Sequence, residues 1–240
     1  MQAFFAHHLL VHTHVAKAAG TTLVEALRGL FGADVCLDLR TADVPRPADL
    51  PDAHRAAVWL LSGHFRAGAH EHLFDRRPLR IATLRAPLPR LCSFLRFLAR
   101  SPTHPEYPRF GTLPPDEAVQ IMLAEGHRMT SASQCAVLSR RRQFAAARRA
   151  AEEEYLLVLP AKRVLEMAGL FAEAFGLPPP PDMRRNASPP GQVLEIDPAL
   201  AEQVATATAE DAQLVAWAEE NADRLLATAR ERLAKLLAAA

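Results

Sequence analysis

Five short apolar segments, separated by loops or by stretches with helical periodicity, constrain the fold of this chain more than any other feature. They span residues 8–15, 34–39, 56–63, 79–84 and 155–159. Segments of this length that are apolar almost throughout are typical of strands buried on both faces. Because strands that alternate with helices pair in parallel, the pattern predicts an α/β fold with a central parallel sheet flanked by helices.

Helical spacing fills most of the chain between and after these strands. After the fourth strand, for example, Leu88, Leu91, Leu95 and Leu98 repeat along one helical face. The predicted helices span residues 21–31, 85–101, 116–150, 162–176 and about 197–238, with 116–150 helical throughout and 197–238 forming one or two closing helices. Because no internal repeat and no convincing boundary divides the chain, residues 1–240 are expected to form a single domain with a helical C-terminal segment.

Composition and charge exclude several classes of protein. Of the 240 residues, 50% are hydrophobic and 23% are charged, and the formal net charge is +1. This balance is typical of a globular protein and argues against a partner held by bulk charge, so we expect neither nucleic acid nor an acidic membrane surface as a partner. No apolar run approaches the roughly 20 residues that cross a bilayer, and we find no secretory signal, so no membrane span is expected.

The cysteines and histidines do not form a metal-binding motif. The three cysteines are Cys36, Cys92 and Cys135. They are widely spaced, without a C-x-x-C pair, and are predicted to be free thiols in a reducing cytoplasm. His7, His8 and His12 are divided between the two faces of the first strand by their spacing, so no metal site is expected there.

The connection between the first strand and the first helix has the composition of an anion-binding turn. In "HVAKAAGTTL" (14–23) a lysine ends the strand, and a glycine and two threonines open the helix. The N–H groups at a helix N-terminus favour an anion, and Gly20 lets the backbone come close to it. Thr21 and Thr22 add hydroxyl donors, and Lys17 adds a full charge. The alternative is a plain connection in which Thr21 or Thr22 only caps the helix.

A second candidate anion site follows the fourth strand, in "LRAPLPRLCS" (84–93). Arg85 ends the strand and Ser93 lies about two turns into the next helix, so both are expected at the same sheet edge as Lys17. Arginine binds phosphate through two parallel hydrogen bonds, and a serine hydroxyl adds another. Two anion sites on one edge suit a nucleotide with phosphate groups at both ends, such as 3′-phosphoadenosine 5′-phosphosulfate (PAPS), a sulfuryl donor.

These segments resemble the motifs of PAPS-dependent sulfotransferases. "HVAKAAGTTL" is similar to their 5′-phosphosulfate loop, H-I-P-K-[TA]-[AG]-G-[TS]-[TS]-L, and "LRAPLPRLCSF" (84–94) to their 3′-phosphate motif, L-R-D-P-x-x-R-x-x-S. "LSGHFRAGAHEHL" (61–73) looks like the G-H-F-x-x-G-x-H-E stretch of the bacterial and glycan O-sulfotransferase branch. The motifs occur in the family's order, and the resemblance implies a P-loop-like sulfotransferase fold.

The resemblance also implies roles for the matching residues. The 5′-phosphosulfate would be bound by Lys17, Ala19, Gly20, Thr21 and Thr22. Arg85 and Ser93 would bind the 3′-phosphate, and no metal would be required. Lys17 would also stabilise the negative charge that develops on the bridging oxygen as the sulfuryl group leaves.

A histidine is the natural base for the acceptor hydroxyl, because its pKa lies near neutrality. His64 follows the third predicted strand and is the leading candidate. His70, Glu71 and His72 are the alternatives, although a helix that shapes the acceptor cleft is the more natural place for them. His14 fits the family motif but is expected to point into the structure.

Two departures from the family pattern leave alternatives open. Ala16 replaces a proline, which costs rigidity in the turn, and Ala86 replaces the aspartate of R-D-P, which removes a group that would hold Arg85. The leading expectation is a sulfotransferase acting on a hydroxyl of a carbohydrate, lipid or small metabolite. A degenerate sulfotransferase fold that binds nucleotide without turnover is the first alternative, and a nucleotide-dependent kinase the second. Neither the acceptor nor the oligomeric state can be inferred from the residues.

Overall fold

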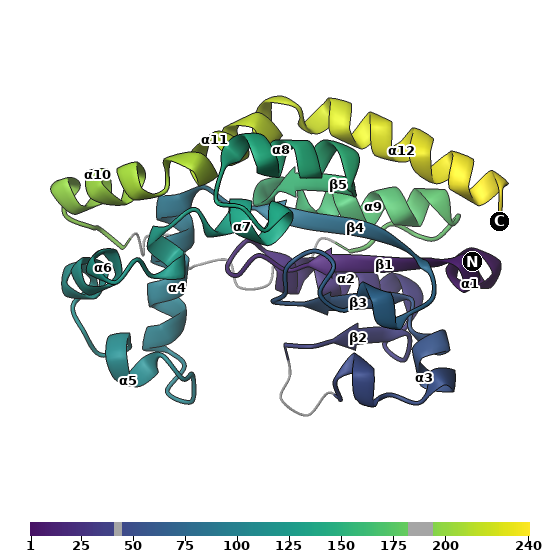
Figure 1. Cartoon of the computed structure of the whole chain (residues 1–240), viewed down its shortest axis with the longest axis horizontal. Helices are drawn as coiled ribbons and strands as arrows, with labels where there is room; N and C mark the ends of the chain where they lie inside the picture. The colour runs from purple at the N-terminus through teal and green to yellow at the C-terminus, as the bar shows by residue number, and fades with distance from the viewer. Residues whose placement is uncertain (41–44, 182–193) are drawn as a thin grey trace.

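The computed structural model describes residues 1–40, 45–181 and 194–240. Within them, a five-stranded parallel sheet has the order β2-β3-β1-β4-β5 (Figure 1). The strands are β1 (His8–Thr13), β2 (Cys36–Asp38), β3 (Leu60–Gly63), β4 (Arg77–Leu84) and β5 (Tyr155–Pro160). Every residue of β1, β3 and β5 is buried, which explains why these strands are apolar without alternation. The prediction of an α/β fold with a central parallel sheet is confirmed.

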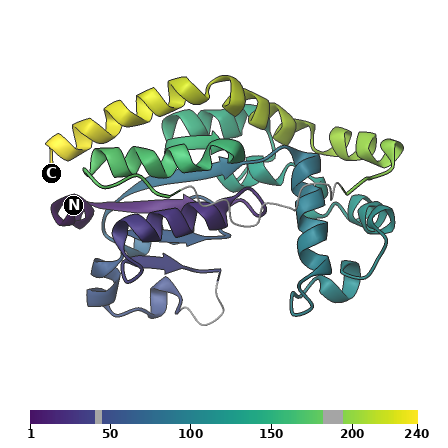
Figure 2. The same cartoon turned by 180° about the vertical axis from the view of Figure 1, so that it is seen from behind.

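Helices cover both faces of the sheet. The helices are α1 (Gln2–His7), α2 (Gly20–Phe31), α3 (Asp52–Ala57), α4 (Pro87–Ala99), α5 (Tyr107–Phe110), α6 (Pro115–Ala124), α7 (Ser133–Ser139), α8 (Phe144–Glu153), α9 (Val164–Ala174), α10 (Pro198–Ala207), α11 (Ala209–Glu220) and α12 (Ala222–Ala238). Helices α2 and α9 pack side by side on one face, in front of the sheet in Figure 2, while α7 and α8 lie on the other. Helices α11 and α12 pack along β5. No helix in the described residues is both long and apolar enough to cross a membrane.

The predicted strand at 56–63 is wrong in its first half. Residues 52–57 form helix α3, and β3 begins only at Leu60. Helix α3 has an acidic residue, Asp52, in its first turn, and three of its six residues are alanine, a strong helix former. None of its residues is buried, whereas Val58 and Leu60 are. The switch from exposed to buried positions therefore marks the true start of the apolar strand.

The prediction of continuous helix over 116–150 is also wrong. The segment is divided into α6, a short 3₁₀ helix (Arg128–Thr130), α7 and α8. Gly126, with φ +61°, follows the end of α6, and Arg140, with φ +63°, ends α7. A residue in the left-handed region closes the last helical turn and redirects the chain. Amphipathic spacing on both sides of such a residue does not reveal it.

The C-terminal segment contains three helices rather than the one or two predicted. Thr208 (φ −115°) separates α10 from α11, and Asn221 (φ −105°) separates α11 from α12. The Thr208 hydroxyl donates to the carbonyl of Val204 at 2.6 Å, and the Asn221 amide donates to the carbonyl of Trp217 at 2.9 Å. Polar side chains that bond back to the preceding turn in this way compete with the helical ladder and bend the chain.

The described residues form three hydrophobic cores, and the two larger ones flank the carboxyl edge of the sheet. The larger core joins the sheet to α2, α8, α9, α11 and α12 and includes Leu10, Leu27, Leu60, Ile81 and Phe171. The smaller core joins α4, α6 and α10 and includes Leu91, Leu98, Val119, Met122 and Val204. Figure 1 shows these three helices grouped beyond the carboxyl ends of the strands. Ligands collect at this edge of a parallel sheet.

Candidate functional site

A cavity of about 970 Å³ lies at the carboxyl edge of the sheet. Each of the five described strands is followed by residues that line it: Gly20 after β1, Arg40 after β2, His64 after β3, Arg85 after β4 and Ala161 after β5. All eight residues predicted for the site line this cavity, namely Lys17, Ala19, Gly20, Thr21, Thr22, His64, Arg85 and Ser93. The structure thus brings together residues from three distant sequence motifs.

The turn before α2 leaves the helix N-terminus open to this cavity. Lys17 and Ala19 both have φ +65°, a left-handed conformation that is uncommon for residues other than glycine. Ala19 precedes the helix, and no described side chain caps it. The alternative in which Thr21 or Thr22 only caps the helix is therefore wrong. The first N–H groups of α2 have no helical partner, which is the arrangement that binds anions at helix N-termini.

Strand β4 and the residue after it hold the turn in this conformation. The Thr83 hydroxyl donates to the carbonyl of Ala18 at 2.5 Å. The Arg85 Nη1 donates to the carbonyl of Lys17 at 3.3 Å. These contacts stabilise the left-handed residues on either side of Ala18, because strained backbone persists only where its surroundings restrain it.

Gly20 is required by the ring of His14 beneath it. A Cβ at position 20 would lie 2.2 Å from Nε2 of His14. That ring is 5% exposed and lies between the rings of His12 and His64, at centroid distances of 5.0 and 4.5 Å, so it has no room to move away. The burial of His14 agrees with the prediction that its side chain points into the structure.

Gly20→Ala is expected to displace the turn, lower stability by about 1–3 kcal/mol through overpacking, and weaken anion binding at the start of α2. Gly29→Ala is the matched control on the same helix, because a Cβ there meets nothing within 4 Å. Removing a glycine from an exposed helix interior should instead stabilise by about 0.5–1 kcal/mol. Urea unfolding and calorimetric titration with pyrophosphate measure both effects. Equal behaviour of the two variants would contradict the packing account.

Lys17 bridges from the turn to α4. Its Nζ lies 4.1 Å from the ring centroid of Phe97, a cation–π contact. Burial, together with the positive charges of Arg85 and Arg100, lowers the pKa of Lys17 to about 8. The ammonium is therefore mostly charged at neutral pH, in a region where neighbouring cations favour an anion.

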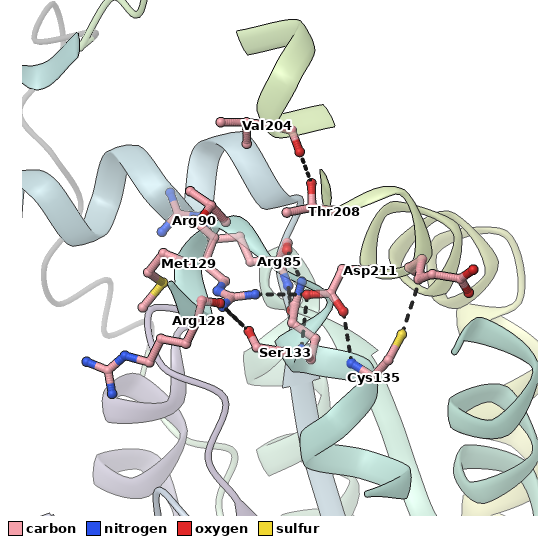
Figure 3. Close-up of polar contacts among 12 residues, drawn as sticks. Arg85, Arg90, Arg128, Met129, Ser133, Cys135, Val204, Thr208 and Asp211 are labelled. Carbon is pink, nitrogen blue, oxygen red and sulfur yellow. Dashed lines mark hydrogen bonds and ion pairs between the residues drawn. The ribbon is translucent and has the colours of Figure 1, made fainter. Parts of the chain in front are cut away.

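Arg85 is held by Gln134, a fully buried residue of α7. The Gln134 side chain accepts a hydrogen bond from the backbone N–H of Arg85 at 3.0 Å and donates to its carbonyl at 2.8 Å. Asp211 of α11 in turn accepts from the backbone N–H of Gln134 at 3.0 Å. It also accepts from the backbone N–H of Cys135 at 2.9 Å (Figure 3). Its buried carboxylate pairs with Arg90 of α4 at 3.1 Å. A buried network thus positions the residue that follows β4.

His64 has the geometry of a base. Its Nδ1 lies 2.9 Å from the carbonyl of His14, and a carbonyl can only accept, so Nδ1 carries the proton. Nε2 is then left with a free lone pair. Desolvation is the main cause that lowers the pKa of His64, and the bond to the His14 carbonyl acts against it. The ring is therefore neutral at pH 7 and able to accept a proton.

The alternative candidates for the base do not line the large cavity. Residues 71–73 form a short 3₁₀ helix. Glu71 is buried and accepts from Arg80 at 2.5 Å. His70, Glu71 and His72 are all absent from the wall of the cavity that His64 lines. In the part of the chain that the structure describes, no group of three or more His, Cys, Asp or Glu residues could hold a metal ion.

Several of the residues that line the cavity were not predicted from the sequence. They include Arg40, Phe97, His104, Arg128, Lys162 and Glu166. Arg40 could have been found, because it follows the second predicted strand just as Arg85 follows the fourth. Phe97 lies one turn beyond Ser93 on the same helix. The others depend on tertiary packing and have no local sequence signal.

Comparisons with known proteins do not identify this site. No protein-family profile matches the chain, and no curated protein sequence matches it.

Proposed function

We propose that the protein is a PAPS-dependent sulfotransferase with a P-loop-like sulfotransferase fold, acting on a hydroxyl of a carbohydrate, lipid or small metabolite. The observation that carries this proposal is the convergence of an uncapped helix N-terminus with Lys17, Arg85 and His64 in one cavity. Two sets of anion-binding groups, one after β1 and one after β4, and a neutral imidazole are the parts that sulfuryl transfer from a bisphosphorylated donor requires. The three free cysteines are compatible with the cytoplasmic location that we also propose.

The residues present fit the donor substrate. The open N–H groups of α2, the hydroxyls of Thr21 and Thr22 and the ammonium of Lys17 would hold the 5′-phosphosulfate. Arg85 and Ser93 would hold the 3′-phosphate. Ala86 provides no carboxylate to orient Arg85, but Gln134 holds its backbone from both sides.

In the proposed reaction, the acceptor oxygen forms a bond to sulfur while the bond from sulfur to the bridging oxygen breaks. The electron pair of the broken bond stays on the bridging oxygen, where Lys17 neutralises the developing charge. The acceptor proton passes to Nε2 of His64, whose tautomer is set by the His14 carbonyl. The products are the sulfated acceptor and 3′-phosphoadenosine 5′-phosphate.

Donor-product binding should depend on the charge of Lys17. Because its pKa is lowered to about 8 in the free protein and an anion raises it, affinity for 3′-phosphoadenosine 5′-phosphate should be nearly constant from pH 7 to 8. Above pH 8 it should fall by up to about tenfold per pH unit, because the complex must then take up a proton. Calorimetric titration over pH 7–9.5 measures this. In Lys17→Arg the decline in affinity above pH 8 should vanish. Parallel declines in the wild-type and Lys17→Arg proteins would contradict the assignment of Lys17 as the titrating group.

A catalytically degenerate, nucleotide-binding protein is the second candidate, favoured by Ala86, which stands where the family has an aspartate that would hold Arg85. A kinase is the weaker alternative, because Thr21 stands directly after Gly20, where a nucleotide-binding P-loop has lysine.

The test is incubation with ³⁵S-labelled PAPS and a panel of carbohydrate, lipid and small hydroxylated acceptors, alongside thermal unfolding with 3′-phosphoadenosine 5′-phosphate. Label transfer with a raised Tm supports the sulfotransferase. A raised Tm without transfer to any acceptor favours the degenerate binder. The absence of both label transfer and a rise in Tm would overturn the proposal.

A further inference from the structure

Arg40 connects the end of strand β2 to the beginning of helix α2. Its Nε donates to both carboxylate oxygens of Asp38, at 2.8 and 3.0 Å, and its Nη2 donates to Oδ2 at 2.6 Å. Its Nη1 donates to Oγ1 of Thr21 at 2.7 Å. Asp38 is only 2% exposed, and Nη2 of Arg28, from α2, lies 3.9 Å from its Oδ2. A buried carboxylate therefore fixes the guanidinium while its other end reaches Thr21.

This contact limits what the Thr21 hydroxyl can do. A threonine hydroxyl has one proton to donate and two lone pairs, and a guanidinium can only donate. The hydroxyl must therefore accept from Arg40, and its own proton is left for another partner. Thr21 is partly exposed and lines the cavity at the first turn of α2. An anion bound at the open N–H groups of that turn can accept a hydrogen bond from this hydroxyl.

The charge of Arg40 is less important here than its shape. Its side chain is 19% exposed and pairs closely with Asp38, so the two charges largely offset each other. Lysine at this position would keep the charge, but an ammonium cannot grip a carboxylate through two nitrogens and reach Thr21 at the same time.

We propose that Arg40 is a positioning residue of the anion site: it holds the Thr21 hydroxyl as a donor toward the anion bound at the start of α2. This inference rests on the proposed function only in identifying that anion as the 5′-phosphosulfate. It adds to the site a residue from the end of strand β2, at the edge of the sheet, and it makes Thr21 a donor with a set direction rather than a freely rotating hydroxyl.

A double-mutant cycle tests the coupling, with Arg40→Lys, Thr21→Val and the double variant titrated by calorimetry. The probes are 3′-phosphoadenosine 5′-phosphate and inorganic pyrophosphate. Each single variant should lose about tenfold in affinity, and the double variant should lose no more than Thr21→Val alone, because the same hydrogen bond is removed. Thr21→Ser, which keeps the hydroxyl, should retain most of the affinity for both probes. Adding Arg40→Lys to Thr21→Ser should lower the affinity as much as it does in the wild-type protein. Arg66→Met, in the loop after β3, is the control and should bind as the wild type does.

The outcomes separate this inference from the proposed function. Equal losses from Arg40→Lys in the wild-type protein and in the Thr21→Val variant would overturn the coupling, since a merely structural role predicts additive losses. Coupling with pyrophosphate but no binding of the nucleotide would support the inference and overturn the proposed donor. Binding of neither probe to the wild type would overturn both. If Arg40→Lys is unfolded at the assay temperature, Arg40→Gln takes its place in the cycle.

Discussion

Lys17→Ala is expected to slow the proposed sulfuryl transfer by about 10²–10³-fold, the loss that follows when one group is removed from a developing negative charge. The lysine is contributed by the turn after β1, its ammonium lies 4.1 Å from the centre of the Phe97 ring, and its pKa of about 8 keeps it mostly charged at pH 7. The charge that it neutralises is larger in the transition state than in the bound donor. The loss should therefore fall mainly on turnover, and affinity for 3′-phosphoadenosine 5′-phosphate should weaken less.

The measurement is the rate of ³⁵S transfer to the best acceptor of the panel, together with a calorimetric Kd for the product nucleotide. Lys235→Ala, an exposed lysine on α12, is the control and should change neither value. A variant that loses only affinity, with turnover intact, would show that Lys17 holds the donor without assisting the departure of the bridging oxygen.

Much of the fold could be predicted because buried parallel strands leave a local signal. Each of the five described strands overlaps a predicted apolar segment, and the order of elements follows from their alternation with helices. The convergence of Lys17, His64 and Arg85 could be predicted for the same reason, since each follows a strand and the carboxyl ends of parallel strands share one edge.

The remaining features depend on contacts between residues far apart in the sequence. Gln134 holds Arg85 across 49 positions, and Arg40 reaches Thr21 across 19. The helix breaks at Arg140 and Thr208 depend on single residues whose neighbours keep helical spacing. Local periodicity does not contain this information, so it predicts neither these side-chain contacts nor the helix ends.

Arg90 shows how a motif residue can have a purely structural position. It is the second arginine of "LRAPLPRLCSF", in the segment that supplies Arg85 and Ser93, yet it does not line the cavity. It is 3% exposed, and besides Asp211 it donates to the carbonyl of Arg128 at 3.0 Å and to the hydroxyl of Ser133 at 2.5 Å (Figure 3). Arg90 thus joins α4, α7 and α11 behind the site.

Arg90→Leu is expected to lower the free energy of unfolding by about 3–5 kcal/mol, because it leaves the fully buried carboxylate of Asp211 without its cation. Arg230→Leu breaks an exposed pair with Glu173, at 3.1 Å, and should cost no more than about 1 kcal/mol. Urea unfolding compares the two, and similar losses would contradict the role of burial. Because Asp211 also holds the backbone of Gln134, which clamps Arg85, the folded Arg90→Leu protein should in addition bind 3′-phosphoadenosine 5′-phosphate more weakly than the Arg230→Leu protein.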